Sequence, residues 1–171
     1  FRQAEISALL DTGYFIDRAE RLYGYPHFIC DTGGSICEWV DPTDPDDQVL
    51  AHLSEQCLMV WIEGSDAHSD ELIRRFDQNP KPMAYQPEFL EKSWSAYRDE
   101  AQALETDVDP DTFIRWTYAR ALAHRQPLYA AMAEHWGVTV QASDMTAVRS
   151  STDFDDVIAN SIDARAIDAR G

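Results

Sequence analysis

Basic side chains are scarce in this 171-residue sequence. Lysine and arginine together number 14, against 31 aspartates and glutamates, and the formal net charge is −17. Proteins that bind nucleic acids or anionic lipid surfaces draw much of their affinity from lysine and arginine. The deficit therefore argues against both kinds of partner. The only lysines in the sequence, Lys81 and Lys92, are too few to form a basic patch.

Long apolar runs and paired cysteines are also absent. No stretch approaches the roughly 20 apolar residues of a transmembrane helix, and no charged-then-apolar signal peptide opens the chain. The cysteines are Cys30, Cys37 and Cys57, and their spacing argues against a disulfide framework or a zinc site. Cys30 and Cys57 stand in or beside apolar runs, where we expect small buried hydrophobes. These absences predict a soluble, cytoplasmic protein.

Several catalytic signatures are missing as well. The histidines lack the HExxH spacing of a zinc enzyme, and Ser35 lacks the GxSxG setting of a hydrolase nucleophile. The acidic, proline-containing stretch 41–47 lacks EF-hand spacing, so we interpret it as a solvated loop rather than a calcium site. No GxxxxGK[ST] phosphate-binding loop occurs in the 171 residues.

What the sequence does contain is an alternation of apolar strands and amphipathic helices. Apolar runs predict buried strands at 27–30, 57–62 and 138–140. Helical spacing of apolar residues, with Gly24 as a stop and prolines in first turns, predicts the helices. These helices are expected at about 1–10, 15–23, 49–56, 70–76, 88–104, 110–136 and 154–165, with a polar loop over 142–152. The repeated strand–helix order predicts a layered α/β domain.

Asp31 is the first candidate for chemistry. It ends the apolar run 28–30, and a carboxylate held at a strand end can bind the Mg²⁺ of a nucleotide, as in a Walker B element. Aspartate also begins many turns, so the run fits either role. The glycines of the following segment 32–35 (TGGS) can let backbone N–H groups cradle an anion, or can make a plain tight turn. Arg74 and Arg75 fit either phosphate contact or a solvated helix surface.

Several segments, in their order along the chain, resemble the later two-thirds of shikimate kinase and related small P-loop kinases. The chain is also similar to alphaproteobacterial proteins described only as ATPases. The resemblance rests on Phe1-Arg2, on 28–34, on 58–76, on Lys81-Pro82-Met83 and on Arg125-Gln126-Pro127-Leu128-Tyr129. It implies an α/β, three-layer P-loop NTPase or NMP-kinase-like parallel sheet. Residues 1–171 would be the C-terminal portion of a single domain, with a helical lid or substrate insert at about 84–124.

The resemblance also implies a role for particular residues. These roles are catalysis and Mg²⁺ binding for Asp31, substrate binding for Arg2, Gly33, Gly34 and Arg125, and nucleotide binding for Lys81, Ser143 and Asp144. The reaction would transfer a phosphoryl group from ATP, with Mg²⁺, to a small anionic metabolite or to water. The family's P-loop and its central N-terminal strand would be missing from this chain. Without them we expect no activity, and we expect that the three predicted strands are not all neighbours.

The sequence departs from the family pattern at three places. Lys81 stands where the family lid has arginine, which keeps a charge but loses the bidentate fork. Ser35 replaces a third glycine, and the stretch 84–124 is longer than the family's connection. A different or larger substrate fits these departures. So does a non-catalytic ligand- or partner-binding module, or a regulatory segment whose acidic helix 87–104 docks a partner. Nothing in the sequence signals an oligomeric state.

Overall fold

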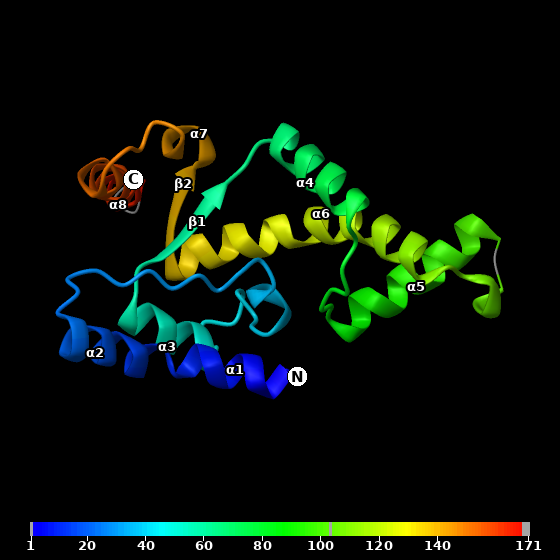
Figure 1. Ribbon diagram of the computed structural model, residues 1–171, viewed down its shortest axis with the longest axis horizontal. Helices are drawn as coiled ribbons and strands as arrows, with labels where there is room; N and C mark the ends of the chain where they lie inside the picture. The colour runs from blue at the N-terminus through cyan, green and yellow to red at the C-terminus, as the bar shows by residue number, and fades with distance from the viewer. Residues whose placement is uncertain (1, 103, 169–171) are drawn as a thin grey trace. The chain divides into compact units, whose positions relative to one another are not determined.

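The computed structural model describes residues 2–102 and 104–168. Phe1 of the Phe1-Arg2 motif, and Ala103 in the predicted insert, lie outside the described residues. The chain divides into two compact units, which we call unit 1 (residues 1–63 and 128–171) and unit 2 (residues 64–127) (Figure 1). Most of the predicted insert 84–124 therefore belongs to the described part of unit 2.

Unit 1 combines helices with a small sheet. Its helical elements are α1 (Arg2–Leu10), α2 (Thr12–Tyr23), the 3₁₀ turn η1 (Ile36–Glu38), α3 (Gln48–Gln56), the end of α6 (Pro110–Trp136), α7 (Ala142–Met145) and α8 (Ser151–Asp168). Helices α1 and α2 both pack against α3, as Figure 1 shows in blue and cyan. The core is aliphatic and consists of Ile36, Cys37, Val40, Val49, Leu50, Leu53 and Met132.

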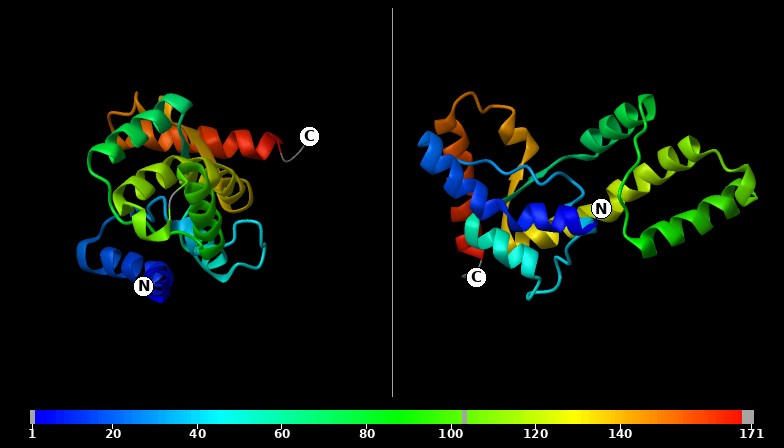
Figure 2. Two further views of the ribbon diagram at one scale, coloured as in Figure 1. Left: turned by 90° about the vertical axis from the view of Figure 1, so that its right-hand side faces the viewer. Right: turned by 60° about the horizontal axis from the view of Figure 1, so that its bottom comes forward.

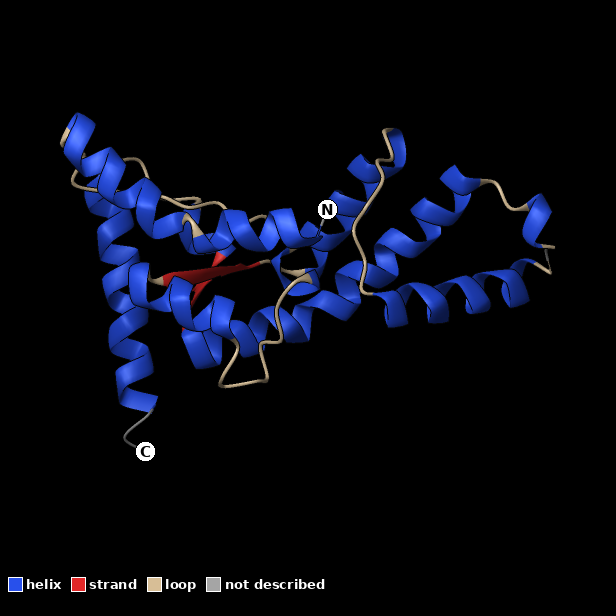
Figure 3. Ribbon diagram, turned by 90° about the horizontal axis from the view of Figure 1, so that it is seen from below, coloured by secondary structure: helices blue, strands red, loops and turns tan. Residues whose placement is uncertain are grey.

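The sheet consists of two parallel strands, β1 (Met59–Glu63) and β2 (Gly137–Gln141), drawn in red in Figure 3. They confirm two of the strands predicted from the sequence. A side chain at Gly137 would collide with the Met59 carbonyl, so the start of β2 needs a glycine. Helix α8 packs against β2. The α/β character is thus present in a mostly helical chain, with a smaller sheet than the resemblance implies.

The third predicted strand is not formed. Residues 28–30 belong to no helix or strand, and the Ile29 side chain is 83% exposed. A strand must pair its backbone N–H and C=O groups with a neighbour, and β1 has only β2 beside it among the described residues. Cys30 and Cys57 are consequently half-buried rather than buried.

Strand β1 also exposes a row of apolar side chains. Leu58, just before the strand, is 45% exposed, and Val60 and Ile62 are 37% and 51% exposed. Alternate residues of a strand lie on one face, so these three side chains point to the same side. Strands of parallel sheets are usually covered on both faces. One face of β1 therefore departs from that rule.

Local signals set several element ends. Gly24 ends α2 in the left-handed conformation (φ 64°), as predicted. Asp47 caps α3 by accepting the N–H groups of Val49 and Leu50. The loop 41–47 is therefore part of the packing as well as solvated, because Pro42 within it is also buried. The loop predicted over 142–152 contains the short helix α7 and the start of α8.

Unit 2 is helical and contains α4 (Asp66–Gln78), α5 (Pro87–Ala101), the 3₁₀ turn η2 (Glu105–Asp107) and the first part of α6. Helix α5 and that part of α6 lie side by side in both views of Figure 2 and touch through rings such as Trp94 and Phe113, whose centroids are 5.0 Å apart. Phe76 of α4 stacks on Tyr118 of α6 at 3.8 Å. Over the described residues, no helix has both the length and the apolarity to span a membrane.

Candidate functional site

Asp31 forms a tight turn with the glycine loop, by which we mean residues 32–35. Its Oδ1 accepts the N–H of Gly33 at 2.8 Å. Gly33 has φ 66°, in the left-handed region where glycine is favoured. The Asp31 side chain is exposed, and the loop leads directly into η1. The carboxylate predicted to bind Mg²⁺ thus also fixes the shape of the glycine loop.

Tyr129 connects the glycine loop to α6 within unit 1. Its hydroxyl donates a short hydrogen bond to the carbonyl of Gly34, 95 residues away in the sequence. Its ring centroid lies 6.4 Å from that of Trp61 in β1. A Cβ on Gly34 would lie 3.0 Å from the Tyr129 hydroxyl oxygen, so a larger residue there would displace the tyrosine. The loop is therefore held beside the sheet by one side chain.

Arg2 lies near the C-terminal end of η1, the 3₁₀ turn that follows the glycine loop. Its guanidinium donates to the carbonyl of Trp39 at 3.4 Å, and Trp39 directly follows η1. The Arg2 side chain is exposed. The arginine predicted to bind substrate is thus a neighbour of η1, where it contacts the backbone.

Ser143 and Asp144 lie in α7, directly after β2. Asp144 lines an open pocket of about 290 Å³ next to α8, together with Ala147, Val148, Asp153, Asp156 and Val157. The N–H of Arg149 and the hydroxyl of Ser150 bind Asp153, which lowers the pKa of its carboxyl group and keeps it charged at neutral pH. Several carboxylates around the pocket disfavour a phosphate.

Arg125 is buried in unit 2, with only 2% of its surface exposed. Its Nη2 donates to the carbonyl of Ala84 at 2.9 Å, and its guanidinium lies 5.9 Å from the centre of the Tyr85 ring. Arg125 therefore anchors the segment 79–86, which joins α4 to α5. Lys81 lies in that segment and is exposed. The two cationic residues predicted for unit 2 thus belong to one local arrangement.

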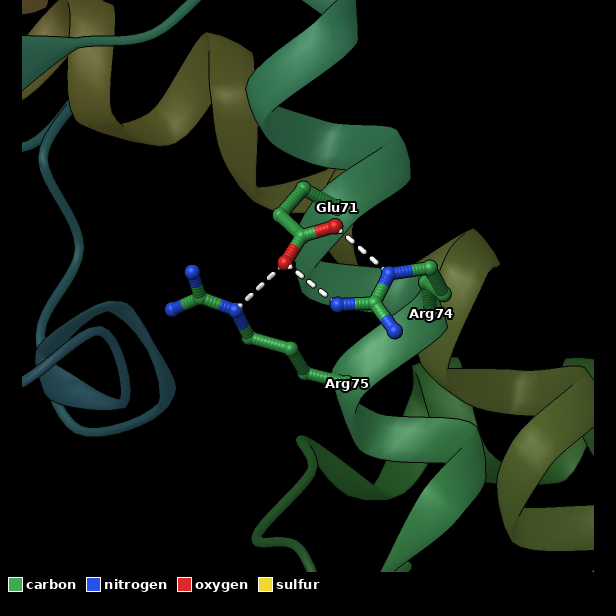
Figure 4. Close-up of polar contacts among 3 residues, drawn as sticks. All are labelled: Glu71, Arg74 and Arg75. Carbon is green, nitrogen blue, oxygen red and sulfur yellow. Dashed lines mark hydrogen bonds and ion pairs between the residues drawn. The ribbon is translucent and has the colours of Figure 1, made fainter.

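Arg74 and Arg75 form an ion-pair cluster with Glu71 on α4 (Figure 4). Arg74 binds both carboxylate oxygens of Glu71, at 2.6 and 2.7 Å, and Arg75 binds one at 2.7 Å. The hydrogen bonds from Arg74 and then Arg75 lower the pKa of Glu71 to about 2. Both arginines are exposed, which favours the solvated interpretation of this pair over a phosphate contact.

The carboxyl ends of the two strands carry a pair that sequence reasoning missed. The Gln141 amide donates to Glu63 Oε2 at 2.6 Å. Open α/β sheets bind ligands at the carboxyl ends of their strands. The sequence signal that could have indicated this pair is that Glu63 and Gln141 each end an apolar run. Tyr129 as the partner of the glycine loop had no comparable local signal.

No group of three or more His, Cys, Asp or Glu side chains within 2–102 and 104–168 is placed to hold a metal ion. A nucleotide-bound Mg²⁺ needs only one or two carboxylates, since phosphates and water supply its other ligands. Asp31 is an exposed carboxylate at its turn. Comparisons of the chain with protein-family models, curated proteins and solved structures found no match.

Proposed function

We propose that these residues belong to an ATP-dependent phosphotransferase or ATPase of the P-loop type that acts on a small anionic metabolite. The hydrogen bond between Tyr129 and Gly34 carries the proposal. It joins the glycine loop to the segment 125–129, and both segments take part in the family resemblance. The parallel pairing of β1 with β2 fits the same kind of fold. The proposal requires a GxxxxGK[ST] loop from outside these 171 residues.

Each residue has a defined part in the proposal. Mg²⁺ bound with ATP supplies neutralisation of the phosphate charge. Asp31 would offer it a carboxylate oxygen, while Lys81 would bring a positive charge toward the phosphates. The glycine loop and Arg2 would bind the anionic group of the substrate. Within unit 2, Arg125 would bind a substrate anion only after releasing the Ala84 carbonyl.

The proposed binding site for adenine is at α7. Ser143 and Asp144 follow β2, and the pocket beside them has both carboxylates and apolar side chains such as Val148. A carboxylate can accept a hydrogen bond from the exocyclic amino group of a base, and the apolar side chains can cover the ring face. The same pocket repels phosphate, so the triphosphate would extend away from it.

The central test is an Asp31→Asn variant of the gene product that contains these residues. Asparagine keeps an oxygen that can accept the Gly33 N–H, so the turn is preserved while the charge is lost. We expect Mg²⁺-dependent ATP turnover to fall by roughly 100-fold or more. Asp46→Asn, in the exposed acidic loop, is the matched control and should leave turnover unchanged. Full turnover in the Asp31 variant would overturn the proposed role.

A second variant tests the contact that carries the proposal. Tyr129→Phe removes only the hydroxyl that binds Gly34. We expect the free energy of unfolding to fall by about 0.5–1.5 kcal/mol. Amide hydrogen exchange should become faster in the glycine loop, and the KM for the anionic substrate should rise. Tyr23→Phe is the control, because that side chain is 65% exposed and stacks on Tyr25. Equal exchange in both variants would show that the hydroxyl does not hold the loop.

A non-catalytic ligand- or partner-binding module is the second candidate. The burial of Arg125 against Ala84 favours it, because a guanidinium fork bound to the backbone is not poised for a substrate. This candidate predicts that Mg²⁺-ATP leaves the melting temperature of the gene product unchanged. A rise in melting temperature with Mg²⁺-ATP favours the kinase proposal instead.

A further inference from the structure

The cysteines of unit 1 lie in different surroundings. Cys37 is fully buried in η1, and its thiol donates to the carbonyl of Gly34 at 3.4 Å. Cys30 and Cys57 are only half-buried. Cys30 directly precedes Asp31, and Cys57 directly follows α3. The two more accessible thiols thus stand at the entries to the Asp31 turn and to β1.

One corner of unit 1 brings these two thiols toward each other. The Sγ of Cys30 lies 3.9 Å from the hydroxyl oxygen of Thr12, the first residue of α2. The next residue, Gly13, contacts Gln56 so closely that a Cβ at Gly13 would lie 3.0 Å from the Gln56 amide oxygen. Gln56 is the neighbour of Cys57 in the chain. Cys30 and Cys57 therefore flank the same Thr12–Gly13 corner.

Electrostatics agrees with this proximity. Burial raises the pKa of the Cys57 thiol, and negative charge on Cys30 raises it further. Two charges affect each other appreciably only at short distances in a protein.

We propose that Cys30 and Cys57 are an oxidation site at which a peroxide forms a reversible disulfide across the Thr12–Gly13 corner. One of the two sulfurs attacks a peroxide oxygen as a thiolate, the O–O bond breaks, and a sulfenic acid and hydroxide result. The other sulfur then attacks the sulfenic sulfur, the S–S bond forms and water leaves. In total, two thiols and one hydrogen peroxide give one disulfide and two waters. A thiol reductant reverses the bond.

The bond has a clear structural consequence. It closes the chain between Cys30 and Cys57 and ties the residue before Asp31 to the segment that enters β1. A cross-link of this kind reduces the freedom of the unfolded chain and of the segment it holds. The Asp31 turn therefore moves less in the oxidised protein. This inference is independent of the proposed phosphotransferase function.

The experiment treats the reduced, purified chain with hydrogen peroxide and then alkylates the free thiols. We expect the intact mass to lose two hydrogen atoms before alkylation, and a non-reducing peptide map after alkylation to show the Cys30 peptide linked to the Cys57 peptide. The melting temperature should rise and return after treatment with a thiol reductant. Cys30→Ser and Cys57→Ser should each abolish the link. Cys37→Ser is the matched control and should keep it.

The peptide map of the unaltered chain decides the question even where a variant fails to fold. A link that involves Cys37, or a link between two molecules, overturns the proposal. So does oxidation of either thiol to its sulfinic acid while the other remains free. A Cys30–Cys57 link that leaves the melting temperature unchanged overturns the structural consequence, because the corner would then not be constrained.

Discussion

In unit 1 most of the buried residues are apolar, and one cluster of them forms the core, whereas in unit 2 the buried residues are small or polar and the large rings stay partly exposed. Leu50 and Val140 are typical of unit 1, with 0% and 1% of their surface exposed. In unit 2 the buried residues are Ser93, Thr117, Ala121 and Arg125. The hydroxyl of Thr117 is satisfied by the carbonyl of Phe113 at 2.8 Å.

The contrast shows two ways of stabilising a small unit. Aliphatic burial contributes about 25 cal/mol per Å² of area removed from water, with little demand on direction. Ring pairs add about 0.5–1.5 kcal/mol beyond their burial and depend on geometry. In unit 2, Trp94, Tyr97, Phe113 and Trp116 form such pairs. Unit 1 should therefore be sensitive to lost volume, and unit 2 to lost polar and ring partners.

The largest expected effect is in the aliphatic core. Leu50→Ala should lower the free energy of unfolding by about 2–5 kcal/mol, because a fully buried side chain leaves a cavity. Leu58→Ala, where the side chain is 45% exposed, should change it by about 0.5 kcal/mol or less. Urea unfolding measures both. Similar decreases in the free energy of unfolding in the two variants would contradict the view that buried aliphatic side chains stabilise unit 1.

A smaller effect is expected at the buried cation of unit 2. Arg125→Met keeps much of the side-chain volume but removes the donor to the Ala84 carbonyl. We expect the free energy of unfolding to fall by about 1–3 kcal/mol. Hydrogen exchange should become faster in residues 79–86 and remain unchanged in the α3 core of unit 1. Arg74→Met is the control, since that arginine is exposed. Slower or unchanged exchange in 79–86 would contradict the anchoring role.

The smallest effect concerns the surface of α4. The pKa of Glu71 is lowered from 4.5 to about 2, so its ion pairs stabilise the folded chain above pH 4.5 and are lost as the pH falls through 2. As the pH falls from 4.5 to about 2, the melting temperature of the unaltered chain should therefore drop slightly more than the melting temperature of the Glu71→Gln variant. Salt should reduce the difference, because the groups are exposed. Glu55→Gln, which alters an exposed carboxylate on α3, should show no such difference.

The elements that the sequence predicts correctly have causes within a few residues. Gly24 ends α2 because glycine adopts the left-handed conformation without a Cβ clash, and Pro87 begins α5 because it needs no N–H partner there. Strands β1 and β2 follow from runs that are apolar on both faces. Such signals require no knowledge of the rest of the chain.

The failures have causes elsewhere in the chain. Residues 28–30 are as apolar as a strand, but strand formation depends on a neighbouring backbone that local pattern cannot supply. The hydrogen bond from Tyr129 to Gly34 depends on how 95 residues fold between them. Arginine is almost never fully buried, so nothing in the sequence marks Arg125 as an internal anchor. The Asp31 turn was predictable as a turn, and its partners were not.

The exposed row of Leu58, Val60 and Ile62 bears on how the protein behaves in concentrated solution. The row lies on a strand with a single strand neighbour among the described residues, and such strands can attract a second copy. The net charge of −17 keeps copies apart, but only over a distance of about 10 Å in 0.1 M salt and about 3 Å in 1 M salt. Concentrated salt should therefore promote precipitation of this protein, whereas dilute buffer near neutral pH should keep it dispersed.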